Sequence, residues 1–442
     1  MSIKKNKRKK IVVRSLGYVL LSLFLISALL STPIVQTRLA KMLTNNLKET
    51  YQTNIIIKRV DLSFLGSVQL KGVEIRDHHN DTLIFVDNLS TSILNARKIL
   101  NNEIDLGSVS LEGASFYLKT YQGEKTDNLD VFVRSFGKGK LKDSLSSEFL
   151  LKTSNIYLND LTFKIINENK KKSLQFGIEK CGGSISDFEI LGSNVTAKVR
   201  GMYFVDDRGI EITNLTTDYK FTKTQMLFQN TIIETVDSKV NLEMVFDYKR
   251  EELKYFNDKV FIEAEFKNST LSLKDLNKLY REIGGADLLH FSGAISGVLN
   301  DFEASQIKLI SDEGMKINAT MHFTNAVDTN NGFIFNGDLK NVTANYQQLK
   351  SVLPNLLGKT LPSEFRRLGD FTLKGKAFIT SDKIDLDIRI KSEIGTTIAD
   401  LVLTHTDVID EAVYKGVIEL VDFDLGVFFD DPLFGKITLG GN

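Results

Sequence analysis

The feature that most constrains this chain is an alternation of apolar and polar residues that is repeatedly interrupted by a slip of one position. The alternation begins near Ile55 and is typical of strands with one buried face. At all but one of the slips two polar or glycine residues stand side by side (Val421-Asp422 is the exception), and the apolar residues then resume on the other phase. Leu70, for example, precedes Lys71-Gly72, and Val73 follows. The pattern predicts a mainly β protein whose strands share one irregularity.

The slip occurs in separate segments along the chain, and we expect an extra, bulged residue at each one. A slip would turn the apolar side chains of a flat strand to the opposite face, so one dry face requires a bulge. Gly, Asn and Asp tolerate the left-handed backbone of a bulge best. The predicted bulge residues are Gly72, Gly113, Asp160, Asn214, Asn341 and Asp422. Tight hairpin turns between short strands are the alternative, because two-residue connections also favour Gly and Asn.

Aligned bends of this kind would crease a long sheet into a trough with an apolar inside. We expect the apolar residues of the slipped segments to line that trough. They are Val68, Leu70, Val73, Leu111, Phe116, Leu118, Leu158, Phe163, Ile212, Leu420 and Phe423. An ordinary core is the alternative for any one of these strands.

The N-terminus predicts a membrane anchor. Residues 1–10 are a basic tail, and residues 11–31 form an apolar run whose only charge, Arg14, lies near the basic end. A helix of this length crosses the hydrocarbon core of a bilayer, and the basic tail favours a cytoplasmic N-terminus. A cleaved signal peptide is the alternative, but the run is long for one.

Residues 32–51 predict an amphipathic helix, and residues 52–442 predict the β body. Thr32-Pro33 is typical of a helix start, and Val35, Leu39 and Leu43 recur on one face. This helix would either lie on the outer membrane surface or cap the β body. Short helical insertions are expected near 128–136, 273–283 and 346–368.

The composition excludes some functions and offers little catalytic chemistry. The chain has 56 basic and 56 acidic residues, but the basic tail precedes the first acidic residue, Glu49, so the body is mildly acidic and no nucleic-acid partner is expected. Cys181 is the single cysteine. No nucleotide, hydrolase or metalloprotease motif occurs, so we predict no catalytic residues, no cofactor and no enzyme activity. Asp77-His78-His79-Asn80-Asp81 contains metal-binding side chains, but a polar hairpin connection is favoured and no metal is predicted.

The region from about Ser31 to Phe136 resembles a known family. The most specific segments are Gly66 to Asp77, Asp81 to Val86 and Asn128 to Phe132, within the stretch that contains GSVQLKGVEIRD and NLDVF. This region is similar to the N-terminal part of TamB-like proteins, the inner-membrane subunits of the translocation and assembly module, in the versions of Bacteroidetes-type Gram-negative bacteria. They belong to the wider AsmA-like superfamily.

The resemblance implies a periplasmic β-taco, which is an elongated curled sheet with an apolar groove, attached to the cell inner membrane by a single transmembrane helix. It implies a bridge-like carrier that moves phospholipid toward the outer membrane in outer membrane biogenesis. An alternative within the same family is a scaffold that assembles outer-membrane proteins. The family pairs with an Omp85-type outer-membrane protein through a C-terminal domain that this sequence lacks, so that contact is assigned to no residue here.

Overall fold

The computed structural model describes residues 32, 34–38, 41–42, 44–45, 54–62, 67–92, 103–132, 150–279, 284–327, 332–352, 362–405 and 413–441. They are mainly β-strands. The chain divides into two compact units, Met1–Asp207 and Arg208–Asn442, which are described separately. The predicted anchor at 11–31 lies outside the described residues. No helix within those residues is both long and apolar enough to cross a membrane.

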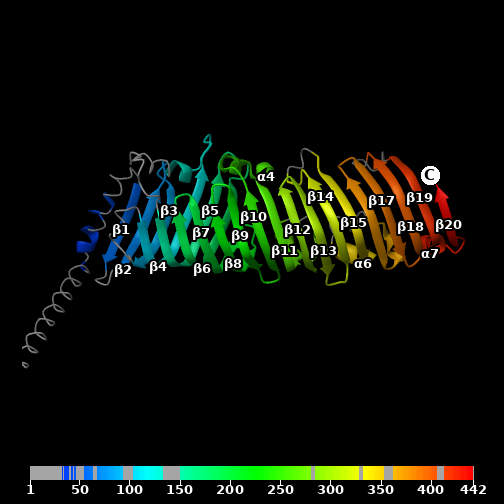
Figure 1. The fold of residues 1–442 in the computed structure, drawn as a ribbon, viewed down its shortest axis with the longest axis horizontal. Coiled ribbons are helices and arrows are strands. Elements are labelled where there is room, and N and C mark those ends of the chain that lie inside the picture. The colour runs from blue at the N-terminus through cyan, green and yellow to red at the C-terminus, as the bar shows by residue number, and fades with distance from the viewer. Residues whose placement is uncertain are drawn as a thin grey trace, which may run out of the picture. The chain divides into compact units, whose positions relative to one another are not determined.

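The first unit contains an open sheet whose strands follow one another in chain order (Figure 1). Its strands are β1 (Asn54–Leu62), β2 (Ser67–Arg76), β3 (Thr82–Ser92), β4 (Glu103–Thr120), β5 (Leu150–Asn167), β6 (Leu174–Leu191) and β7 (Asn194–Asp206). Neighbours are antiparallel except for β4 and β5, which run parallel. The segment 121–149 connects that parallel pair, so the chain returns from one edge of the sheet to the other before β5 begins.

The predicted slips form one row across β1 to β5. In the β2–β3 register Lys71 faces Asn88 and Val73 faces Val86, so Gly72 lies opposite Asp87. By the same count Lys58 lies opposite Gly72, Asp87 opposite Gly113, and Gly113 opposite Asp160. The backbone is left-handed at Gly72 (φ 58°), Gly113 (φ 60°) and Asp160 (φ 54°). We call this set of aligned residues (58, 72, 87, 113 and 160) the slip row.

The slip row corrects the predicted mechanism of the first slips. The registers of β1–β2, β3–β4 and β4–β5 continue across the row without a shift, and that of β2–β3 shifts only beyond it, at Arg76. On its other side β5 shifts against β6 between Leu158 and Leu161, so Asp160 is a bulge toward β6, as predicted. A bulge would set two residues of one strand against one residue of its neighbour. Here each strand from β1 to β5 has one additional outward-facing residue at the same level. The apolar side chains of neighbouring strands therefore change phase together. The hairpin alternative is wrong, because each slipped segment lies inside one continuous strand.

The second unit contains an open antiparallel sheet that also follows chain order. Its strands are β8 (Glu211–Phe221), β9 (Gln225–Glu234), β10 (Lys239–Asp247), β11 (Phe261–Ser272), β12 (Leu288–Val298), β13 (Asp301–Ser311), β14 (Lys316–Thr324), β15 (Ile334–Ala344), β16 (Phe371–Ile379), β17 (Lys383–Ser392), β18 (Gly395–Thr404), β19 (Val413–Asp424) and β20 (Lys436–Gly441).

In this unit the slips are true bulges on some strands that face straight neighbours. Asn230 on β9, Asn268 on β11 and Gln306 on β13 have left-handed backbones, and the register shifts beside each. Asp422 on β19 has φ 48° and a shift against β20. The register also shifts on both sides of Asn341 on β15, although its φ is not left-handed.

Asn214 departs from the prediction. Its φ is not left-handed, and the β8–β9 register continues through it to Thr216. The shift falls between Thr216 and Asp218, where the hydroxyls of Thr217 and Thr231 lie 2.7 Å apart in the interior. One residue of β8 here opposes two residues of β9, so the bulge at this shift is Asn230 on β9 and β8 is its straight partner.

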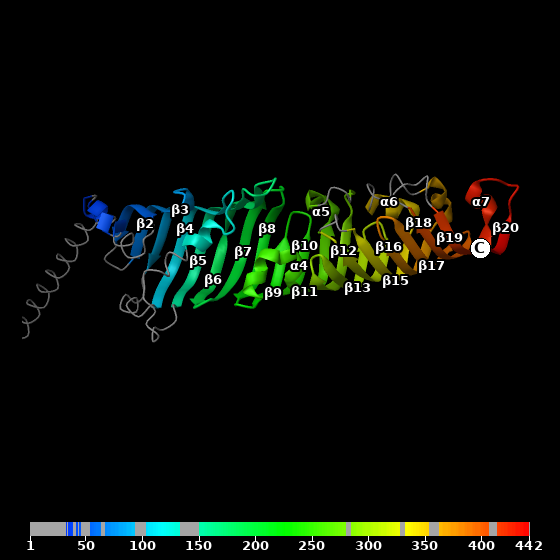
Figure 2. The same ribbon diagram turned by 90° about the horizontal axis from the view of Figure 1, so that it is seen from above.

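Short helices lie along the two edges of the second sheet that the strand ends form. Successive antiparallel strands end at opposite edges of this kind, so each helix lies at the edge where its preceding strand ends. η2 (Arg250–Tyr255) and α4 (Phe256–Lys259) follow β10 at one edge. α5 (Leu273–Leu279), α6 (Tyr346–Val352), η4 (Ser363–Leu368) and α7 (Leu425–Phe429) follow odd-numbered strands at the other. Figure 2 shows α5 and α6 along this edge. They cover a buried cluster that includes Leu273, Met315, Ala344 and Phe371.

The predicted helical insertions are present where the structure describes them. Residues 128–132 are helical, α5 covers the start of 273–283, and α6 and η4 cover the two ends of 346–368. The helices α4 and α7 were not predicted. Leu425, two positions after Phe423, ends the alternation of β19 and begins α7.

Within the predicted amphipathic helix, residues 34–38, 41–42 and 44–45 are helical. The Thr44 hydroxyl accepts a hydrogen bond from the Ile57 N–H of β1 at 3.3 Å, so this segment contacts the first strand.

Replacing Gly72 by Ala should lower the free energy of unfolding. A residue with a Cβ in this left-handed conformation costs about 1–2 kcal/mol, and the added carbon would lie 2.5 Å from Cδ of Lys58. The midpoint of urea denaturation of the full chain measures the effect.

Gly177→Ala on β6 is the matched control. Its Cβ would make ordinary contacts at 3.5 Å or more, and its φ is not left-handed. A Gly72→Ala midpoint equal to that of the control would contradict the role of the slip row.

Candidate functional site

The candidate site is the apolar face that the slips keep continuous. In the first unit Leu70 precedes the slip on β2 and Val73 follows it, yet both pack in one cluster. The buried members are Ile55, Ile57, Val60, Val73, Val86 and Ala114, and Leu70, Ile75, Ile84, Leu89, Leu111 and Leu161 pack against them. The phase change therefore leaves the apolar side chains on one face, as the sequence predicts.

Beyond this cluster the face carries aromatic rings that remain partly exposed. Phe116 of β4 faces Phe163 of β5, with ring centroids 5.4 Å apart, and Phe176 of β6 continues the row at 6.2 Å. Phe116 and Phe163 are half-buried, as are Val68, Leu118 and Leu158. A sheet normally covers its apolar face with a second layer. Within the described part of this unit, the only helical residues are those near 34–45 and 128–132, so the described residues place no such layer over much of the face.

In the second unit the apolar face contains a cavity of about 270 Å³. Its lining is entirely apolar and comes from β10, α4, β11, β12, β13 and the β12–β13 turn. The lining residues are Met244, Phe246, Phe256, Ile262, Ala264, Phe266, Ile295, Gly297, Val298, Leu299 and Phe302. An apolar cavity of about 150 Å³ stays dry and binds benzene, so a hollow of this size and lining suits a hydrocarbon segment.

Aromatic side chains flank this cavity on both sides. Tyr219 and Phe228 lie 5.1 Å apart by ring centroid, and Phe228 and Phe246 lie 5.8 Å apart. Phe256 of α4 meets Phe246 edge-on at 5.5 Å, so the short helix forms one wall. On the other side Phe323 lies 5.0 Å from Phe302 and continues the row. These rings make a wide apolar surface at little cost in side-chain entropy.

The other predicted lining residues lie elsewhere on the chain. Leu420 and Phe423 of β19 belong to the cluster beneath the edge helices, where Phe423 is only 4% exposed. Ile212 of β8 is half-buried and belongs to neither buried cluster. Sequence reasoning missed the cavity residues of β10 and β11, although the alternation in Leu242–Phe246 and Ile262–Phe266 was a usable signal.

The opposite face is polar and carries ion pairs. Lys164 lies 2.7 Å from Glu179 on the neighbouring strand, and Lys152 lies 2.8 Å from Glu189. The hydrogen bond from Lys164 lowers the pKa of Glu179. Exposed pairs of this kind add little stability, but they keep the outer face solvated. The sheet therefore has one wet and one apolar face.

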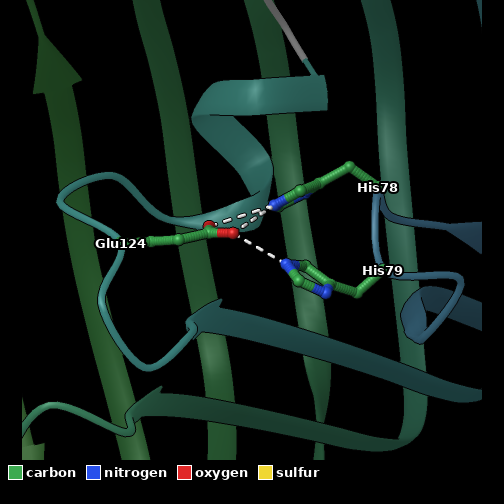
Figure 3. A group of neighbouring side chains, drawn as sticks. All are labelled: His78, His79 and Glu124. Atoms are coloured by element: carbon green, nitrogen blue, oxygen red, sulfur yellow. Dashed lines mark hydrogen bonds and ion pairs between the residues drawn. The ribbon is translucent and has the colours of Figure 1, made fainter.

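One cluster of side chains has the chemistry to hold a metal ion. The segment 77–81 connects β2 and β3, as the hairpin prediction required, and its two histidines meet Glu124 from the loop that follows β4 (Figure 3). His79 Nε2 lies 2.7 Å from Glu124 Oε1, and His78 Nε2 lies 3.0 Å from Oε2. The hydrogen bond from His79 lowers the pKa of Glu124. No sequence pattern indicated that Glu124 would join the two histidines.

Together, the fold and the site define an open β-sheet protein with an apolar face kept dry across repeated slips. No protein-family model matches the chain, and no curated protein matches it.

Ile295→Asp should weaken binding of a fluorescent fatty acid by at least about tenfold, because the new carboxylate has no partner in the apolar lining. Ile295 lines the cavity from β12. Fluorescence titration of the full chain measures this affinity.

Ser296→Asp is the control, since Ser296 is the exposed neighbour on the same strand. Equal affinities for the two variants, with unchanged circular dichroism, would exclude the cavity as the binding place.

Proposed function

We propose that this chain carries lipid, with acyl chains held on the apolar face of its open, creased sheets. The observation that supports this most directly is the cavity of about 270 Å³ lined only by apolar side chains. The half-buried aromatic rows of the first unit add a broader surface of the same character. Contiguous apolar surface of this kind marks an interaction site.

The physical role of such a surface is to replace a membrane interior. Exposing an acyl chain to water costs about 0.8 kcal/mol for each methylene group, so a whole chain costs on the order of 10 kcal/mol. On an open sheet the acyl chain of the lipid contacts the apolar face while the polar head group stays in water. Movement of lipid along such a sheet needs no covalent chemistry, which agrees with the absence of catalytic motifs in the sequence.

The resemblance to TamB-like proteins supports the rest of the proposal. It assigns a β-taco architecture to the sheets, phospholipid as the cargo, and a place between the cell inner membrane and the outer membrane. The apolar run at 11–31 is the proposed single-pass anchor, with the basic tail in the cytoplasm and the body in the periplasm. The proposed outer-membrane partner is an Omp85-type protein, as the same resemblance implies.

A photo-crosslinking amino acid at Phe163 or Phe246 tests the cargo directly. Both side chains belong to the apolar face, so crosslinking in cells should give phospholipid adducts that mass spectrometry identifies. The same probe at Lys164, on the ion-paired outer face, should give few of them.

Adducts with nascent outer-membrane proteins instead of lipid would support the assembly scaffold and overturn the lipid proposal.

Replacing Phe116 and Phe163 together by Asp should block transport while the protein stays folded. The rings face each other across β4 and β5, so the double change places two charges on the path of an acyl chain. Outer-membrane lipid composition in cells that depend on this variant is the measurement.

Normal composition and unaltered lipid crosslinking in the double variant would contradict the proposal. Thr162→Asp, next to Phe163 on β5, is the control for the added charge, because alternation places it on the other face.

A further inference from the structure

Three loops meet at one edge of the first unit, and two of them bring metal-ligating side chains together. The β2–β3 turn carries His78 and His79, and the loop after β4 carries Glu124. Adjacent residues of an extended strand would point to opposite sides. The turn removes that obstacle, because its backbone bends at Asn80 (φ 65°) and both imidazole rings point toward the same carboxylate (Figure 3).

The turn is held in this shape by buried polar contacts. Asp77 Oδ1 accepts hydrogen bonds from the N–H groups of His79 at 2.9 Å and Asp81 at 3.0 Å. Its other oxygen accepts from the Tyr121 hydroxyl at 2.7 Å and from Asn128 Nδ2 at 2.9 Å. Asn128 is fully buried and also accepts from the Lys119 N–H at 2.8 Å. Rigid support of this kind is what orients the ligands of a metal.

The loop that carries Glu124 is equally well supported. The Glu124 N–H donates to the Tyr121 carbonyl at 3.0 Å. Asn169, from the loop after β5, donates to the carbonyls of Tyr121 at 3.1 Å and Glu124 at 3.0 Å. The His79 ring lies against the Tyr121 ring, with centroids 3.8 Å apart. The three ligand side chains are therefore placed before any ion arrives.

We propose that His78, His79 and Glu124 form a binding site for a divalent first-row transition metal ion of the zinc class. One ligand atom from each lies within 4.8 Å of the other two. In a tetrahedral zinc site with bonds of about 2.0–2.1 Å, ligand atoms are about 3.3 Å apart, so small side-chain rotations suffice. Two imidazoles and one carboxylate leave a fourth position for water, and these side chains are 28%, 45% and 30% exposed, so an ion can enter from solvent.

The charge around the cluster also favours a cation. Asp77 and Asp81 lie in the same turn, and Glu168 lies across the neighbouring loop. Lys119 is the nearby counter-charge and is already shared between Asp81 at 3.1 Å and Glu168 at 3.0 Å. Each imidazole presents Nε2 to an ionised carboxylate, so that nitrogen carries a proton without the ion. Metal binding would replace the two protons, and these would pass to solvent.

The bound ion would join the β2–β3 turn to the loop that begins the crossover between β4 and β5. It would thereby fix the start of that crossover to the antiparallel part of the sheet.

Equilibrium dialysis of the untagged full chain against zinc, followed by elemental analysis, tests the site. The wild type should bind one equivalent, and Co²⁺ in its place should give the visible absorption of a tetrahedral site. Glu124→Gln and His79→Gln should each weaken zinc binding by at least about tenfold, because one of three protein ligands is lost.

His290→Gln and His322→Gln are the controls. Each removes an exposed histidine paired with one aspartate, at 2.8 Å from Asp312 and 2.6 Å from Asp301, and neither pair belongs to a group of three metal-ligating side chains among the described residues. They should leave zinc binding unchanged. Wild-type protein that binds no zinc, or Glu124→Gln that binds as tightly as wild type while its urea midpoint is normal, would overturn the proposal.

Discussion

Keeping one apolar face through a change of phase is the constraint on which both units depend. A strand that slips by one position presents its apolar residues to the wrong side unless the backbone turns with it. From β1 to β5 of the first unit the turn occurs at the same level on adjacent strands, where Gly72, Gly113 and Asp160 are left-handed, while β6 shifts its register against both neighbours. In the second unit residues such as Asn230 and Asn268 provide it on single strands that face straight neighbours. Two different arrangements thus maintain the same dry face.

The two arrangements have different effects on the interstrand hydrogen bonds. Where all strands slip together, each keeps its register and only one level of pairing is interrupted. Where one strand bulges against a straight neighbour, the register shifts and the strand twists more strongly. The side chains of the slip row point outward and are mostly polar, as Lys58 and Asp87 illustrate, so the irregular level faces water and the apolar level stays continuous.

The sequence predicted the strands and one face well, because alternation is a local property. It also placed α5, α6 and η4, whose periodicity and prolines are visible along the chain. It could not show whether a slip was a bulge or an aligned row, since that depends on whether the neighbouring strand carries the same slip. Lys58-Arg59 is such a case: it lacks the Gly or Asp that marks the other members of the slip row. The cluster of His78, His79 and Glu124 was also invisible, because Glu124 reaches the turn only through the pairing of β3 with β4.

The parallel pairing of β4 with β5 has a consequence for the order of folding. The hairpins of β1 to β4 join strands that are near one another in sequence, so they can form early. The β4–β5 pair can form only when the long segment 121–149 closes into a loop. This closure costs conformational entropy before any contact between β4 and β5 forms. Pairing of β4 with β5 is therefore the step expected to limit the rate at which the first unit folds. Until it forms, β4 is an exposed edge strand open to pairing with other chains.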